Sequence, residues 1–123
     1  GRERSELLRH AYCMLMPTTY TEPFGSAGVE GMLCGTPLLA SDFGAFSETV
    51  RQGVTGYRCK TLGDWLYAIA AAGTLDRKAI ATQARAQYDM RRCGMLLDKV
   101  FRQVQGLQDQ GWYDLEPLMA IPG

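Results

Sequence analysis

The feature that most constrains this chain is an alternation of short apolar runs with segments of helical periodicity. Ala11 to Met16 is an unbroken apolar run that stops at Pro17. Such a run is typical of a strand buried on both faces, as in parallel sheets. Pro37 to Ala40 and Thr55 to Cys59 predict two further short strands. The sequence therefore predicts three strands with helical segments between and after them.

Helices are predicted between these strands and over the rest of the chain. The predicted helices are Arg4–Arg9, Ser26–Leu33, Phe46–Gln52, Leu62–Ala72, Arg77–Tyr88 and about Arg91–Gln108. Gly35 and Gly53 follow two of these segments and favour their termination. The last helix is amphipathic, with Met95, Leu96, Val100, Phe101 and Val104 on one side. The tail from Trp112 to Gly123 carries two prolines and is predicted to be extended.

Strands that alternate with helices through short connections imply parallel pairing and right-handed crossovers. The predicted fold class is α/β, a partial Rossmann-like domain of about three parallel strands with flanking helices and a long C-terminal helix. A doubly wound sheet normally has five or six strands, so residues 1–123 correspond to about half of one.

Composition excludes several function classes. Lysine plus arginine equals aspartate plus glutamate, 13 each, which argues against a nucleic-acid grip or a polybasic membrane anchor. No apolar stretch is long enough to span a bilayer and no signal peptide is visible. The four cysteines, Cys13, Cys34, Cys59 and Cys93, are not spaced as C-x-x-C, which favours free thiols over a zinc or redox site. We therefore expect a cytoplasmic protein with no metal and no cofactor.

The stretch Glu22-Pro-Phe-Gly-Ser-Ala-Gly-Val-Glu30 carries the chemistry. It places one glutamate in the loop after a strand, then a glycine-flanked turn, then a second glutamate about one turn into a helix. Loop amides and a helix N-terminus at the end of a parallel strand form a site for anions and hydroxyls. Gly25 and Gly28 would let a ligand approach the backbone closely.

The position of Glu30 in the sequence is consistent with two different roles. A carboxylate at this place could grip neighbouring hydroxyls of a ribose. A glutamate in the first turns of a helix is also favoured by the helix dipole, by about 0.3–1 kcal/mol. Because the surrounding residues are apolar, a carboxylate here needs a partner in either case.

The chain resembles glycosyltransferase family 4, retaining enzymes of the GT-B architecture with two Rossmann-like domains facing a cleft. The likeness rests on Glu22 and Glu30 separated by seven residues and on Cys34-Gly35-Thr36-Pro37 followed by Leu38-Leu39-Ala40-Ser41. Gly44, Glu48, Gly53 and Thr55-Gly56 then follow in the family's order.

The resemblance implies that the chain is the C-terminal part of a domain that binds a nucleotide-sugar donor. Glu30 would hold the ribose, and Glu22, assigned as the catalytic-site residue, would contact the hydroxyls of the donor sugar. Phe24, Gly25, Ser26 and Ala27 would offer backbone amides to the sugar and the diphosphate. No metal is needed, because basic residues and amide dipoles stabilise the leaving group.

The chain also departs from the family pattern. The family's phosphate-binding arginine and lysine have no counterpart here, and its acceptor domain would lie upstream, so we expect the isolated chain to be inactive towards its unknown acceptor. The alternative is a non-catalytic binding or assembly module that keeps the scaffold. Glu48 could cap its short helix or touch the donor. The unprotected strand Ala11–Met16 also predicts a homo-oligomer.

Overall fold

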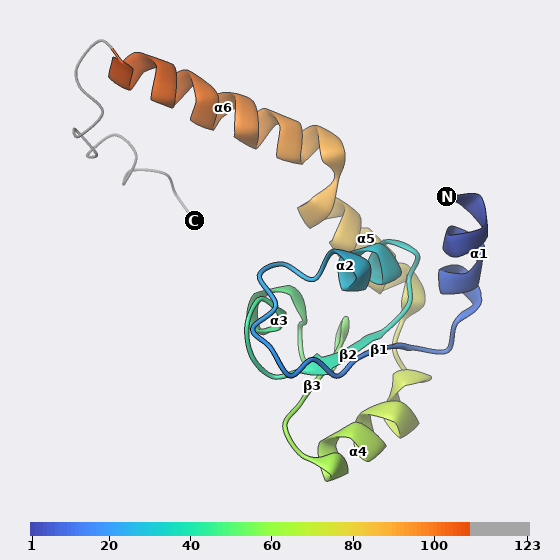
Figure 1. The fold of residues 1–123 in the computed structure, drawn as a ribbon. Helices are drawn as coiled ribbons and strands as arrows, with labels where there is room; N and C mark the ends of the chain where they lie inside the picture. The colour runs from blue at the N-terminus through green and yellow to red at the C-terminus, as the bar shows by residue number, and fades with distance from the viewer. Residues whose placement is uncertain (109–123) are drawn as a thin grey trace. The chain divides into compact units, whose positions relative to one another are not determined.

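The structure of this chain is a computed structural model that describes residues 1–108. Its elements are α1 (Arg2–His10), β1 (Met14–Met16), α2 (Ser26–Leu33), β2 (Leu38–Ser41), α3 (Phe46–Thr49), β3 (Gly56–Cys59), α4 (Leu62–Ala72), α5 (Arg77–Tyr88) and α6 (Met90–Gln108) (Figure 1). Residues 1–87 form one compact unit, and the residues from 88 onward form a second. The tail predicted to be extended, Trp112–Gly123, lies outside the described residues.

The sheet confirms the predicted α/β class and the three parallel strands. Its order is β1-β2-β3, with both pairings parallel. Leu38 of the central strand β2 lies opposite Met14 on one side and Gly56 on the other. All four residues of β2 are buried, as the unbroken apolar run predicts.

Helices cover both faces of the sheet. Figure 1 shows α4 against one face and α2 with α3 against the other. Gly28 and Gly31 face the sheet from α2. A Cβ atom at Gly28 would lie 2.6 Å from Leu38 Cδ2, and one at Gly31 would lie 3.0 Å from Met14 Sδ. Gly28 therefore allows close packing of helix on sheet, whereas the sequence had suggested that it gives a ligand access to the backbone.

Most predicted boundaries agree with the structure, and the differences have local causes. The bounds of α2, α4 and α5 are as predicted. Strand β1 is shorter than Ala11–Met16 because the amide of Ala11 still bonds to carbonyls of α1. Helix α3 ends at Thr49, before the predicted Gln52, because Val50 is extended and Gln52 forms an isolated bridge with Gly56.

The start of α5 is tied to the end of α1. The Arg77 guanidinium donates to the carbonyl oxygens of Arg9 at 2.7 Å and Ala11 at 2.8 Å, and to Thr36 Oγ1 at 3.2 Å. The Thr36 hydroxyl in turn donates to the carbonyl of Leu8. Carbonyls at a helix C-terminus have no partners within the helix, so these bonds satisfy α1 where it ends. Arg77 thus joins three segments that are distant in sequence.

No helix within residues 1–108 combines the length and the apolar character that crossing a bilayer requires. Strand β1 pairs only with β2 among the described strands, so it forms one edge of the sheet. Leu15 at its centre is half exposed. The predicted homo-oligomer is not tested by these observations and stays a prediction.

Candidate functional site

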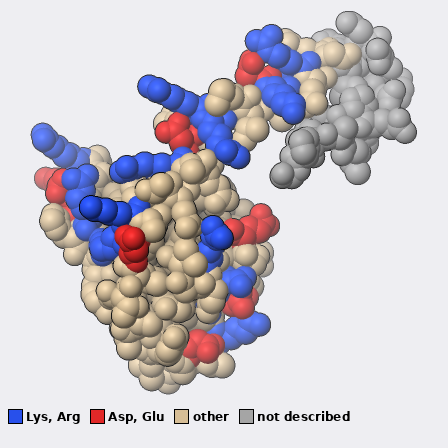
Figure 2. Space-filling model, turned by 180° about the vertical axis from the view of Figure 1, so that it is seen from behind, with Lys and Arg blue, Asp and Glu red and all other residues tan. Residues whose placement is uncertain are grey.

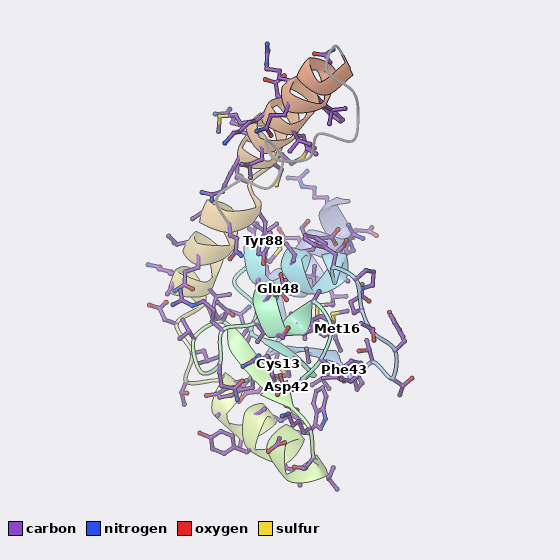
Figure 3. The ribbon with its side chains drawn as sticks, turned by 90° about the vertical axis from the view of Figure 1, so that its left-hand side faces the viewer. Cys13, Met16, Asp42, Phe43, Glu48 and Tyr88 are labelled. Atoms are coloured by element: carbon purple, nitrogen blue, oxygen red, sulfur yellow. The ribbon has the colours of Figure 1, made fainter. Side chains whose placement is uncertain are left out.

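The candidate site lies at the carboxyl ends of the parallel strands. In open α/β sheets, ligands bind outside this edge, where the loops after neighbouring strands meet. The loop after β1 runs over residues 17–25 and ends at the start of α2, and the loop after β2 runs over residues 42–45. Figure 3 labels Met16 at the end of β1 and Asp42 with Phe43 directly after β2.

The Glu22 carboxylate at this edge is held by hydrogen bonds from its own loop. Tyr20 Oη donates to Glu22 Oε2 at 2.7 Å, and the amide of Gly25 donates to Oε1 at 2.9 Å. The Phe24 amide approaches Oε1 at 3.4 Å. The Tyr20 hydrogen bond, followed by that of Gly25, lowers the pKa of the Glu22 carboxyl, and the same hydroxyl contact raises the pKa of Tyr20. The carboxylate is thus ionised and oriented, with lone pairs left to accept from a ligand.

Gly25 sets the turn between this loop and α2. It is the N-cap of α2 and adopts φ +78°, in the left-handed region, where a side chain is strained. A Cβ atom there would lie 2.7 Å from Cε1 of Phe46, a fully buried residue of α3. Ser26 and Ala27 follow as exposed residues, and no side chain caps the first turn of α2. This turn can therefore offer amide donors to an anion or a hydroxyl.

Gly44 holds the two loops together, which the sequence alone did not indicate. It has φ +63°, and a Cβ atom would meet the backbone oxygen of Glu22 at 2.8 Å and its nitrogen at 2.9 Å. The Ala45 amide donates to the Glu22 carbonyl at 2.9 Å. The backbone that carries Glu22 is therefore fixed by the loop after β2.

Glu30 has the partner that its apolar surroundings require. Arg4 Nη2 of α1 lies 2.9 Å from Glu30 Oε2, and the Glu30 side chain is 39% exposed. A depression of about 230 Å³ adjoins this ion pair, and it is lined by Arg4, Ser5, Leu8, Glu30, Leu33 and Cys34. The structure thus brings Glu22 and Gly25 into one turn, whereas Glu30 pairs with α1.

A second depression lies at the same edge of the sheet and was missed by sequence reasoning. It has a volume of about 450 Å³ and is lined by Thr18, Thr19, Ser41, Asp42, Phe43, Cys59, Lys60 and Trp65. Asp42 Oδ1 lies 3.3 Å from Arg58 Nη1, and Oδ2 lies 3.4 Å from Lys60 Nζ. The sequence does contain a signal for these ion pairs. Asp42 directly follows one predicted strand, and the basic residues Arg58 and Lys60 lie at the end of the next one. Asp42 therefore has a structural role in pairing the ends of β2 and β3.

The remaining candidates stay at the surface. Glu48 lies in the first turn of α3 and is exposed, so the structure keeps both of its predicted roles open. His10 is exposed, with Nε2 3.5 Å from Glu6 Oε2. Within residues 1–108, no group of three or more His, Cys, Asp or Glu side chains could hold a metal ion. Figure 2 shows basic and acidic side chains interspersed over the face that it presents.

The sequence matches a known protein family and known proteins of similar sequence. The family described as "Glycosyl transferases group 1" matches residues 2–71, more than half of the chain. D-inositol 3-phosphate glycosyltransferase from Mycobacterium sp. (strain KMS) is 35% identical over 89 residues, which cover 69% of this chain and 20% of that protein. Glycogen synthase from Mycobacterium tuberculosis (strain CDC 1551 / Oshkosh) is 38% identical over 81 residues, which cover 66% of this chain and 19% of that protein. The chain thus spans about a fifth of these relatives.

The fold is also found in a solved structure. The crystal structure of Anabaena HepE in complex with UDP-glucose matches with a TM-score of 0.63 at 22% sequence identity. The match covers 80% of this chain and 29% of HepE. At this identity the likeness concerns the fold, which is the α/β arrangement described above.

Proposed function

The chain belongs to the glycosyl transferases group 1 family, and from this premise we propose that it forms the donor-binding part of a sugar-transferring enzyme. The enzyme would move a sugar from a nucleoside-diphosphate sugar to an acceptor, with retention of the anomeric configuration. Residues 1–123 would be the C-terminal part of the nucleotide-sugar-binding domain. The acceptor-binding domain would lie upstream in the longer protein, which agrees with the small share of each relative that the chain covers.

The single observation that carries this proposal is the turn from Glu22 to Gly25. Its carboxylate is held by Tyr20 and by the Gly25 amide, and the uncapped N-terminus of α2 follows directly. A fixed carboxylate accepts hydrogen bonds from sugar hydroxyls, and helix amides stabilise a diphosphate. That HepE was solved with UDP-glucose supports a ligand of this class.

Each site residue has a role in the proposal. Glu22 would accept from the donor sugar, and Glu30 would accept from the ribose. The amides of Ser26 and Ala27 would face the sugar and the diphosphate, whereas the predicted donors Phe24 and Gly25 already donate their amides to Glu22 Oε1 and would hold that carboxylate in place. These donors would supply the electrostatic stabilisation of the leaving group without a metal or a cofactor. The four cysteines are free thiols, which suits the reducing cytoplasm that we propose as the location.

The Arg4–Glu30 ion pair favours the second candidate function, a non-catalytic binding or assembly module. A carboxylate engaged at 2.9 Å by α1 contributes to the attachment of that helix. A ribose would have to share or displace this contact. The two candidates therefore differ in what the loss of Arg4 does. If Glu30 binds ribose, Arg4→Ala preserves or strengthens nucleotide binding, whereas a scaffold role predicts only a loss of stability.

The test is a titration of the ¹⁵N-labelled chain with UDP-glucose, UDP and glucose, followed by NMR. We expect shifts at the amides of Gly25, Ser26 and Ala27 with UDP-glucose. Glu30→Gln should weaken UDP binding by about 10- to 150-fold, equivalent to about 1.5–3 kcal/mol for a charge-assisted bond pair. Glu22→Ala should remove the additional affinity that the sugar gives and leave UDP binding unchanged.

The matched control is Glu6→Gln, which removes a carboxylate from α1 at its contact with Arg9 and His10, a different cluster from the Arg4–Glu30 pair. It should leave all three titrations unchanged. No UDP-glucose-dependent shift at residues 25–27 in the folded chain would contradict the donor site and support the module. Equal UDP affinity for the chain and for Glu30→Gln would contradict the ribose role alone.

A further inference from the structure

The second depression, of about 450 Å³ at the carboxyl edge of the sheet, has no part in the proposed donor site. Its lining residues all lie within unit 1–87. They come from the loop after β1, from the end of β2 and the loop that follows it, from the end of β3, and from α4. The volume falls within the range of about 300–1,000 Å³ that is typical of small-molecule sites. The second depression is therefore large enough for a small ligand.

The second depression lies toward the α4 face of the sheet, away from the turn Glu22–Gly25. Side chains alternate between the two faces of a strand. Leu39 packs with buried residues of α4, so Ser41, two positions further on, also faces α4. By contrast, Gly25 lies against Phe46 of α3, on the face that α2 and α3 cover (Figure 1). A ligand in the second depression is therefore separate from the donor sugar.

Three hydroxyl groups line the second depression, those of Thr18, Thr19 and Ser41. Ser41 is only 8% exposed, and its Oγ donates to the Thr18 carbonyl at 2.9 Å, which leaves lone pairs that can accept. Thr18 Oγ1 is buried, and within residues 1–108 it has no hydrogen-bond partner. A buried hydroxyl without a partner costs free energy. These groups favour a ligand that both donates and accepts hydrogen bonds.

The charges that line the second depression cancel. Asp42 and Lys60 are its charged lining residues. Asp42 Oδ2 lies 3.4 Å from Lys60 Nζ, and Oδ1 lies 3.3 Å from Arg58 Nη1. Each carboxylate oxygen keeps a lone pair for a hydroxyl donor, and the Lys60 ammonium keeps N–H groups for a hydroxyl oxygen. Since an anion would meet Asp42 and a cation would meet Lys60, a neutral ligand rich in hydroxyl groups fits best.

Two aromatic side chains also line the second depression. Phe43, in the loop after β2, is 39% exposed, and Trp65 of α4 is half-buried. Figure 3 labels Phe43 together with Asp42. The C–H groups on one face of a sugar ring are apolar and slightly positive, so they pack against the negative face of an aromatic ring. Aromatic rings beside hydroxyl and carboxylate acceptors are the combination that a neutral sugar ring requires.

We propose that the second depression is a saccharide site that binds a neutral sugar ring of the acceptor. The saccharide chemistry follows from the lining residues alone. The assignment to the acceptor rests on the proposed function, because a transferase with its donor at the turn Glu22–Gly25 needs its second sugar at the same edge. The loops of residues 17–25 and 42–45 both contribute to the second depression, and the Ala45 amide holds the Glu22 carbonyl. The two sites are thus built from the same pair of loops.

The first experiment titrates the ¹⁵N-labelled chain with methyl α-glucoside, methyl α-mannoside and methyl β-galactoside, without nucleotide. With at least one of them, we expect saturable NMR shifts at the amides of Thr19, Phe43 and Lys60 and at the indole N–H of Trp65. A dissociation constant of about 1–10 mM is expected for a single exposed ring. Inorganic phosphate is the comparison ligand, and it should give no saturable shift at these signals.

Two variants with matched controls test the lining residues. Phe43→Leu keeps the apolar bulk but removes the aromatic face, and it should weaken saccharide binding by about 2- to 10-fold. Its control is Tyr67→Leu, since Tyr67 is 65% exposed on α4 and does not line the second depression. Asp42→Asn should weaken binding by about 10-fold or more. Its control is Asp98→Asn, which removes a carboxylate paired with Arg102 and should leave binding unchanged.

The second experiment repeats the saccharide titration in the presence of saturating UDP-glucose. Both ligands should bind together. The saccharide shifts at Thr19, Phe43 and Lys60 should therefore persist, while residues 25–27 keep the shifts that UDP-glucose causes. Displacement of one ligand by the other would assign the second depression to the donor sugar and overturn the acceptor role.

Three results would overturn the saccharide site itself. They are no saturable shift with any of the three glycosides, saturable shifts with phosphate in their place, and equal weakening by Phe43→Leu and Tyr67→Leu. Failure of the proposed function gives a different pattern, in which UDP-glucose leaves residues 25–27 unshifted while a glycoside still binds. That pattern would retain the saccharide site and overturn its assignment to the acceptor.

Discussion

Substitution of Gly25 by alanine tests how the candidate site is built into the fold. Gly25 has φ +78°, and the added Cβ would lie 2.7 Å from Cε1 of the fully buried Phe46. The left-handed backbone costs a non-glycine residue about 1–2 kcal/mol. Forcing an extra methyl group into a packed core costs about 1–3 kcal/mol. We therefore expect Gly25→Ala to lower the free energy of unfolding by about 2–5 kcal/mol, out of a typical total of about 5–15 kcal/mol.

Gly53→Ala is the matched control. Gly53 has φ +70°, but no atom lies within 4 Å of the position of its Cβ. It should therefore show only the backbone cost of about 1–2 kcal/mol. Both substitutions reduce the freedom of the unfolded chain in the same way, so this effect cancels in the comparison. The difference between the two variants isolates the contact with Phe46.

The assay is urea unfolding at a fixed protein concentration, followed by far-UV circular dichroism. A double variant, Gly25→Ala with Phe46→Leu, should destabilise by less than the sum of its parts, because the smaller side chain makes room for the methyl group. Equal destabilisation by Gly25→Ala and Gly53→Ala would refute the reasoning. It would show that Phe46 moves aside without cost and that the turn does not depend on α3.

Three further predictions concern other contacts. Arg77→Lys should lower the free energy of unfolding of residues 1–87 by about 1.5–3 kcal/mol, measured by urea unfolding. The lysine ammonium cannot reproduce the several hydrogen bonds that the planar guanidinium donates. An unchanged free energy of unfolding would contradict the role of Arg77 in joining α1 to α5. Tyr20→Phe should raise the pKa of Glu22, measured by carbon-detected NMR, because its largest stabilising bond is lost. Since folding lowers this pKa, the contribution of Glu22 to stability is present above its unfolded pKa of about 4.3 and disappears as the pH falls through the folded pKa. An unchanged Glu22 titration in Tyr20→Phe would contradict the assignment of the lowered pKa to the Tyr20 hydrogen bond. UDP-glucose binding should be insensitive to EDTA, and loss of binding that manganese restores would indicate a metal site.

Local signals in the sequence were sufficient for the elements of the fold. Uninterrupted apolar runs identify both β1 and the central strand β2. The predicted burial on both faces holds for β2 and is wrong for β1, which forms an edge of the described sheet and has no buried residue. Helix α4 follows its N-cap Thr61, whose hydroxyl accepts from the Asp64 amide in a capping box, so this helix start depends only on four neighbouring residues. The turn from Glu22 to Gly25 could also be located, since its bonds join residues two or three positions apart.

What the site residues contact could be found only in the tertiary structure. Glu30 pairs with Arg4 of helix α1. The backbone of Glu22 is held by Gly44, which lies in the loop after β2. No periodicity encodes such pairs, because they depend on how α1, α2 and the strand ends are placed in space. The sequence by itself determined which segments form strands and helices and where the turn from Glu22 to Gly25 lies. Only the packing of helix on sheet decided that Gly28 faces Leu38 and that the Glu30 carboxylate is paired with a cation, because both contacts join elements separated along the chain.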